Sequence, residues 1–163
     1  LSQLPGRIIL GRGNHDYWWQ SEKKIAAALP SNVIPLHHRA IRLGEKTVCS
    51  TRLWSCPGSN DFTTSDAKIY RRELLRLEMA LNAGKALGGE QVAMVHYRPT
   101  NERLEENECI ELLKSYGVTL CLYGHLHGAD TSRHLPAEKW GIRFVLTSAD
   151  FLRFVPFYLW EEN

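Results

Sequence analysis

Three short segments of this 163-residue chain carry side chains that could bind metal ions and phosphate. They are residues 13–16 (Gly-Asn-His-Asp), His96 with the residues after it, and residues 124–128 (Gly-His-Leu-His-Gly). Histidine is the commonest metal ligand, and an Asn side chain adds a neutral oxygen ligand. Asn14, His96 and His125 could therefore hold one ion. The His-x-His spacing would direct His127 toward a second ion a few ångströms away.

Two neighbours of Asn14 could serve a substrate instead of a metal. His15 is poorly placed to bind the same ion as Asn14, which leaves it free to contact a substrate oxygen. Asp16 could accept a hydrogen bond from the His15 ring and so fix its tautomer and orientation. Arg12, just before this turn, is a candidate donor to phosphate oxygens.

The elements around these segments explain how they could meet. Each segment follows an apolar run that predicts a strand, at 7–10, 91–95 and 119–123, and sites in open α/β sheets form at the carboxyl ends of strands. Further strands are predicted at 33–36, 143–147 and 154–160, with a hairpin at 40–51. Helices are predicted at 21–29, 66–87 and 109–116. This alternation is typical of a layered α/β protein.

Bulk composition narrows the functional classes. The length fits one domain, residues 1–163, and no segment is apolar enough to cross a membrane. The net charge of +2, with both signs interspersed, gives no strong signal for nucleic acid. Four cysteines without a C-x-x-C pair argue against a disulfide framework, so we expect a reducing, cytoplasmic location. Composition leaves the oligomeric state open.

In this order, the three segments resemble the third, fourth and fifth signature blocks of the calcineurin-like metallophosphoesterases. The runs 12–19 (RGNHDYWW), 70–77 (YRRELLRL) and 123–128 (YGHLHG) are similar to a bacterial subgroup of predicted phosphohydrolases. The resemblance implies a layered αββα sandwich of two mixed sheets flanked by helices. It also implies two divalent ions, Mn²⁺, Fe²⁺/³⁺ or Zn²⁺, and a small phosphomonoester or phosphodiester as the substrate.

The resemblance assigns a role to each site residue. Asn14, His96 and His125 would bind the second metal ion. His127 would bind the first. His15 would contact the phosphate and protonate the leaving oxygen, with Asp16 orienting it. A hydroxide bridging the two ions would attack phosphorus. Arg98 stands where we expect Pro in such proteins, so it is a weak candidate for phosphate binding.

One part of the family pattern is not found in these residues. Family members carry Asp-x-His and Gly-Asp-x-x-Asp upstream of the Gly-Asn-His block, which supply the bridging carboxylate and the other ligands of the first ion. We therefore expect the chain to be the C-terminal two-thirds of the domain, truncated at its N-terminus, with one exposed sheet edge. Residues 1–163 alone should then be inactive. The alternative function is a non-catalytic module that keeps the fold as a scaffold.

Several conspicuous residues are predicted to lie outside the site. His37, His38 and His134 are expected at the surface. Paired aromatics usually serve packing, so Trp18 and Trp19 are assigned to the core in preference to a substrate pocket. The loop carboxylates Asp130 and Asp150 receive no role.

Overall fold

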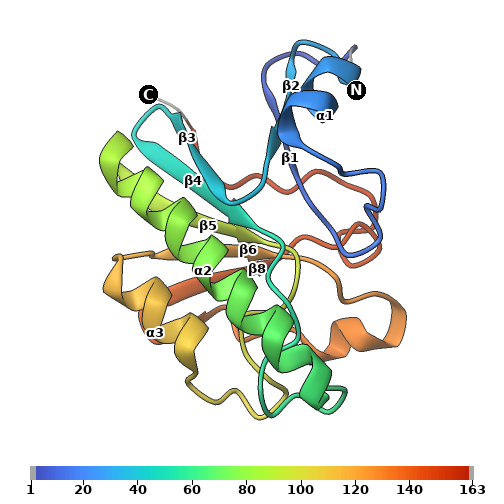
Figure 1. Ribbon diagram of the computed structural model, residues 1–163, viewed down its shortest axis with the longest axis vertical. Coiled ribbons are helices and arrows are strands. Elements are labelled where there is room, and N and C mark those ends of the chain that lie inside the picture. Colours follow the sequence, from blue (N-terminus) through green and yellow to red (C-terminus); the bar gives the residue numbers. More distant parts are fainter. Residues whose placement is uncertain (1–2, 162–163) are drawn as a thin grey trace.

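The computed structural model describes residues 3–161 as a helix layer, two sheets and a further helix (Figure 1). The larger sheet has six strands in the order β3 (Arg39–Leu43), β4 (Lys46–Thr51), β5 (Glu90–Val95), β6 (Leu120–Tyr123), β8 (Ile142–Leu146) and β7 (Glu138–Lys139). The four central strands are parallel, and the two edge strands are antiparallel to their neighbours. The carboxyl ends of β4, β5, β6 and β8 therefore lie along one edge.

The smaller sheet consists of β1 (Ile8–Gly11) and β2 (Val33–Leu36), paired in parallel and connected through α1 (Glu22–Ala28). Among residues 3–161, each of these two strands has one edge without a strand neighbour. The helices α2 (Thr64–Leu87) and α3 (Glu108–Ser115) cover the other face of the larger sheet (Figure 1). This arrangement is the layered sandwich that the sequence predicts.

Alternation along the central strands produces a core on each face of the larger sheet. Cys49, Ala93 and Cys121 face α2 and α3, whereas Val48, Val92 and Leu122 face the smaller sheet. Successive side chains of a strand point to opposite faces, so both sets are buried because both faces are covered.

The helices begin where the sequence supplies capping residues. Ser21 accepts a hydrogen bond from the backbone of Lys24 at the start of α1, and Asn107 does the same for Ile110 at the start of α3. A capping box between Thr63 and Asp66 begins α2. These side chains satisfy backbone N–H groups that have no partner within the helix.

Two residues of α2 show how closely it packs on β4. A Cβ added to Gly84 would lie 2.4 Å from the sulfur of Cys49, so only glycine fits there without a shift. Glu73 is fully buried on the same face, where its carboxylate accepts hydrogen bonds from Thr51, Arg52 and Arg76. A buried carboxylate requires such partners.

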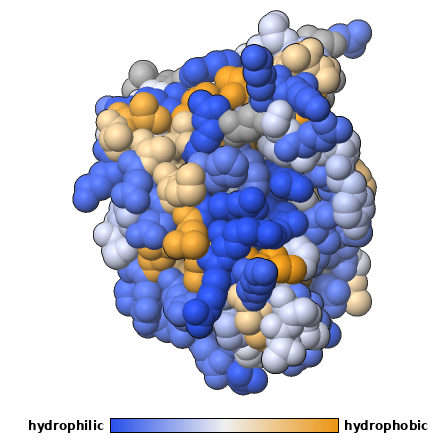
Figure 2. Space-filling model, in the orientation of Figure 1, coloured by the Kyte–Doolittle hydropathy of each residue, from blue (hydrophilic) through white to orange (hydrophobic). Residues whose placement is uncertain are grey.

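The opposite face of α2 retains large apolar side chains. Leu75, Met79 and Leu87 are exposed, and the space-filling view shows apolar patches separated by hydrophilic surface (Figure 2). Single apolar residues on a surface are normal for soluble domains. None of the described helices is long and apolar enough to cross a membrane.

The predicted strand at 154–160 is wrong. This segment has no regular secondary structure, because Arg153 and Phe154 adopt positive φ angles of 53° and 58° and Pro156 lacks a backbone N–H. Leu159 and Trp160 nevertheless pack against the core between the two sheets. The other apolar side chains of the segment are exposed, among them Phe154, Val155 and Tyr158. The structure also contains two elements that the pattern did not predict, β7 and the short 3₁₀ helix η1 (Gly128–Arg133).

Candidate metal centre

Three predicted metal ligands from separate strands meet at one point. Oδ1 of Asn14 lies 2.8 Å from Nε2 of His96, and the same nitrogen lies 3.2 Å from Nδ1 of His125. Asn14 follows β1, His96 follows β5 and His125 follows β6. The convergence predicted from the sequence is therefore present for these three side chains.

Backbone hydrogen bonds align the two histidines. The N–H of His96 donates to the carbonyl of Arg52, and the carbonyl of His96 accepts from the N–H of Gly124. These bonds extend the pairing of β4, β5 and β6 by one step beyond the strand ends. Because the strands are parallel, side chains just past their ends lie next to one another.

A glycine lets the Asn14 turn approach. A Cβ on Gly13 would lie 3.2 Å from Cε1 of His96 and 3.4 Å from the carboxylate of Asp16, closer than most such contacts. A larger residue would push the turn away from the His96 ring. The glycine of this turn is thus required by the close approach.

His125 is held in a strained backbone conformation. Its φ is 70°, in the left-handed region that costs a non-glycine residue on the order of 1–3 kcal/mol. Its ring packs on Tyr97 with centroids 4.1 Å apart and also contacts His96. Strain of this kind persists where surrounding contacts fix the conformation, as these rings do here.

The environment of both central imidazoles favours their neutral forms. Burial and, to a smaller extent, nearby His125 lower the pKa of His96 to about 4. Burial likewise lowers the pKa of His125, with His127 adding to the effect. A neutral imidazole keeps a lone pair for a metal ion.

The distances from Nε2 of His96 to the donor atoms of Asn14 and His125 fit neighbouring positions around one ion. With bonds of about 2.1 Å, adjacent ligands are roughly 3.0 Å apart in octahedral and roughly 3.4 Å apart in tetrahedral geometry. The distances of 2.8 and 3.2 Å lie close to the octahedral value. Within residues 3–161, however, no three His, Cys, Asp or Glu side chains gather as a metal-binding group, and His127 does not join His96 and His125 in one.

A carboxylate that the sequence did not identify contacts the fourth predicted ligand. Nδ1 of His127 lies 3.3 Å from Oδ1 of Asp150, and Oδ2 of Asp150 accepts a hydrogen bond from the backbone of Gly128. Asp150 follows β8, so it reaches the turn after β6 from the neighbouring strand. A carboxylate bonded to one ring nitrogen leaves the other free to bind metal.

Arg12 and His127 line one cavity together with two members of the trio, His96 and His125. The cavity has a volume of about 300 Å³, and its walls include Arg12, His96, His125 and His127. Nε of Arg12 is buried and has no hydrogen-bond partner within the described residues. Burial and the nearby charge of Arg52 lower the pKa of Arg12.

Ser148, also in this wall, was not identified from the sequence. It is buried, and its hydroxyl has no hydrogen-bond partner in the described part of the chain. A lone serine gives no pattern by which it could have been found.

His15 and Asp16 do not form the predicted pair. The carboxylate of Asp16 accepts hydrogen bonds from the N–H of Gly13 at 2.7 Å and from the indole of Trp18 at 3.1 Å, and no bond to the His15 ring occurs among the described residues. His15 is exposed and packs edge-on against Tyr17. Asp16 thus closes the turn that presents Asn14, and the catalytic roles of His15 and Asp16 stay predictions.

Some of the residues predicted to lie outside the site have the expected burial, and others do not. His134 is exposed as expected, but the prediction for His37 is wrong: it is buried beside Trp19, and this burial lowers its pKa to about 3. Trp19 belongs to the core as predicted, whereas Trp18 is 52% exposed. Arg98 is buried and donates hydrogen bonds to the backbone carbonyls of Thr100 and Arg133.

Comparison with known proteins gives one result. A family model described as calcineurin-like phosphoesterase matches residues 1–129, which include Asn14, His96, His125 and His127. Searches of curated proteins and of solved structures each found no significant match.

Proposed function

The chain belongs to the calcineurin-like phosphoesterase family, and from this premise we propose that it forms the catalytic part of a metal-dependent phosphohydrolase. The substrate is a small phosphomonoester or phosphodiester. The observation that supports this function most directly is the meeting of Asn14, His96 and His125 at distances suited to one divalent ion. The proposed second ion is held by His127 together with further ligands.

Bound divalent ions supply Lewis acidity and lower the pKa of coordinated water. The protein's own residues position the substrate. Arg12 lines the cavity, and its guanidinium would donate to phosphate oxygens. His15, exposed next to Asn14, would give a proton to the leaving oxygen. Asp16 holds the turn that positions Asn14 and His15.

Metal binding tests the proposal directly. We expect Mn²⁺ or Zn²⁺ to bind at the trio, as measured by isothermal titration calorimetry, and His96→Ala to weaken binding at least tenfold. His134→Ala is the matched control, because His134 is exposed on the loop that follows η1. Equal affinity in both variants would remove the metal centre from the proposal.

Hydrolysis is measured with p-nitrophenyl phosphate and bis(p-nitrophenyl) phosphate in the presence of Mn²⁺. We compare residues 1–163 with the product of the complete reading frame, since a second ion needs more ligands than His127 alone. We expect activity in the longer protein, and loss of it in His15→Ala. A scaffold protein would show no metal-dependent hydrolysis and no difference between wild type and His15→Ala.

A further inference from the structure

A second cavity lies beside the metal centre. It has a volume of about 230 Å³ and shares His125 with the cavity described above. Its walls come from the loops that follow β4, β5 and β6, at residues 55–61, 97–102 and 126–133. It therefore opens at the same edge of the sheet as the three metal-binding turns.

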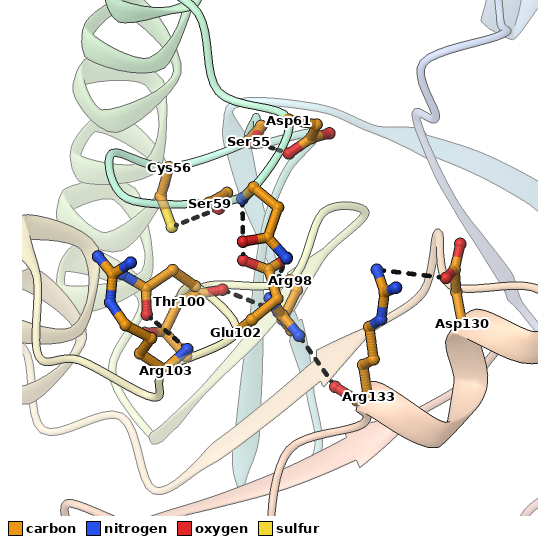
Figure 3. A network of polar contacts seen from close by, with 12 residues as sticks. Ser55, Cys56, Ser59, Asp61, Arg98, Thr100, Glu102, Arg103, Asp130 and Arg133 are labelled. Atoms are coloured by element: carbon orange, nitrogen blue, oxygen red, sulfur yellow. Dashed lines mark hydrogen bonds and ion pairs between the residues drawn. The ribbon is translucent and has the colours of Figure 1, made fainter.

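The walls of this cavity are fixed by a polar network centred on Arg98 (Figure 3). The Arg98 guanidinium donates to the carbonyls of Thr100 and Arg133 at 2.9 Å each and pairs with Glu102 at 2.8 Å. Glu102 in turn accepts a hydrogen bond from the backbone of Asn60 at 3.1 Å. The ion pair of the buried Arg98 with the half-buried Glu102 thus connects all three loops, and a preorganised pocket loses little entropy on binding.

Several polar groups in the walls of this cavity can still form hydrogen bonds with a ligand. Oδ1 of Asp61 accepts from Ser55, which leaves its second oxygen for other donors. Asp130 pairs with Arg133 at 3.4 Å, a long contact between two exposed side chains that a ligand can replace.

The cavity lining combines hydrogen-bond acceptors, hydrogen-bond donors and the aromatic ring of Tyr97. Asp61 and Asp130 accept hydrogen bonds, Arg133 donates, and Ser59 can do either. Tyr97 contributes an aromatic ring that already packs on His125.

We propose that this cavity binds the leaving group of the substrate, and that the leaving group is uncharged and carries neighbouring hydroxyl groups, as a polyol or a sugar does. The inference rests on the proposed function, because the phosphoryl group must lie at the metal centre for its ester substituent to reach past His125. Each hydroxyl is both a donor and an acceptor, so a mixed lining satisfies it.

The charges of the lining argue against an anionic leaving group. Three carboxylates, Asp61, Glu102 and Asp130, face two guanidiniums, Arg98 and Arg133. Arg98 is already committed to loop carbonyls and to Glu102. A second phosphate, as in a polynucleotide, would meet an excess of negative charge.

A pair of substrates that differ only in hydroxyl groups tests the inference. We compare kcat/KM for glycerol 1-phosphate and n-propyl phosphate in the product of the complete reading frame with Mn²⁺. We expect glycerol 1-phosphate to be preferred by roughly tenfold or more, the discrimination available to a site that hydrogen-bonds substrate hydroxyls. Asp61→Asn and Asp130→Asn should each reduce this ratio severalfold. Glu45→Gln, in the exposed β3–β4 turn, is the control and should leave the ratio unchanged.

The outcomes separate this inference from the proposed function. Hydrolysis of p-nitrophenyl phosphate together with a ratio near one, or with a ratio that neither variant changes, overturns the leaving-group assignment alone. A preference for phosphocholine over glycerol 1-phosphate also overturns it, since the carboxylates would then select a cation. Absence of hydrolysis for every phosphoester rejects the proposed function and, with it, this assignment.

Discussion

Replacing Glu73 with Gln removes a buried charge that is connected to His96 of the candidate metal centre through Arg52. The carboxylate is fully buried and accepts hydrogen bonds from Arg76 at 2.7 Å, Arg52 at 3.0 Å and Thr51 at 3.2 Å. Arg52 also supplies the carbonyl that accepts hydrogen bonds from the backbone of His96 and Tyr97. Loss of the charge would leave two guanidiniums without their counter-ion.

The structure sets the expected size of this effect. Removing one member of a buried ion pair costs about 3–5 kcal/mol. The side chains of Arg52 and Arg76 are 11% and 30% exposed, so water compensates part of their charge and the lower end applies. A loss of about 3 kcal/mol corresponds to a fall in Tm of roughly 6–12 °C for a chain of this size.

Thermal unfolding followed by circular dichroism, with urea unfolding for the free energy, measures this loss. Glu78→Gln is the matched control, because Glu78 lies five residues further along the same helix and is exposed. It should change the free energy of unfolding by no more than about 0.5 kcal/mol. If Glu73→Gln is no more destabilising than Glu78→Gln, the buried carboxylate does not hold the two arginines as argued.

Three further predictions follow from other contacts. Asp150→Asn should weaken Mn²⁺ or Zn²⁺ binding at His127 by about 10–100-fold in calorimetry, because it removes the carboxylate that orients the ring; unchanged affinity would contradict this. Asp66→Ala should lower the free energy of unfolding by about 1 kcal/mol in urea through loss of the α2 capping box. Hydrogen bonds from Thr63 and Trp54 lower the pKa of Asp66, so this contribution should be present at neutral pH and disappear as the pH falls through the lowered pKa. Burial raises the pKa of Cys49 and Cys121 to about 12, so these thiols should not react with Ellman's reagent at pH 8 until the protein unfolds. The unfolded chain loses these protons near pH 9 while the folded chain retains them, so stability should fall as the pH rises above about 9.

The sequence determined the main elements of the fold and the central part of the site. Short apolar runs predicted every strand of both sheets except β7, and Pro, Gly and capping residues predicted the helix ends, because these are local preferences of the backbone. The positions of His96 and His125 just after apolar runs predicted that these two side chains meet, because neighbouring parallel strands bring their carboxyl ends to one edge of a sheet. Asn14 follows β1 of the smaller sheet, so its approach to His96 depends on how the two sheets pack.

Only the tertiary structure decided which side chains support that centre. Asp150 lies 23 residues from His127, and the contact depends on β8 pairing beside β6, which no local pattern specifies. Glu73 sits in a run of charged residues that favours a solvated helix face, yet Arg52 from another strand end makes its burial possible. The segment 154–160 has the apolar content of a strand, but its backbone turns at Arg153 and Phe154 and only its end is buried. In each case the final conformation depends on contacts with residues that are distant in the sequence. Local preferences of the backbone do not encode those contacts.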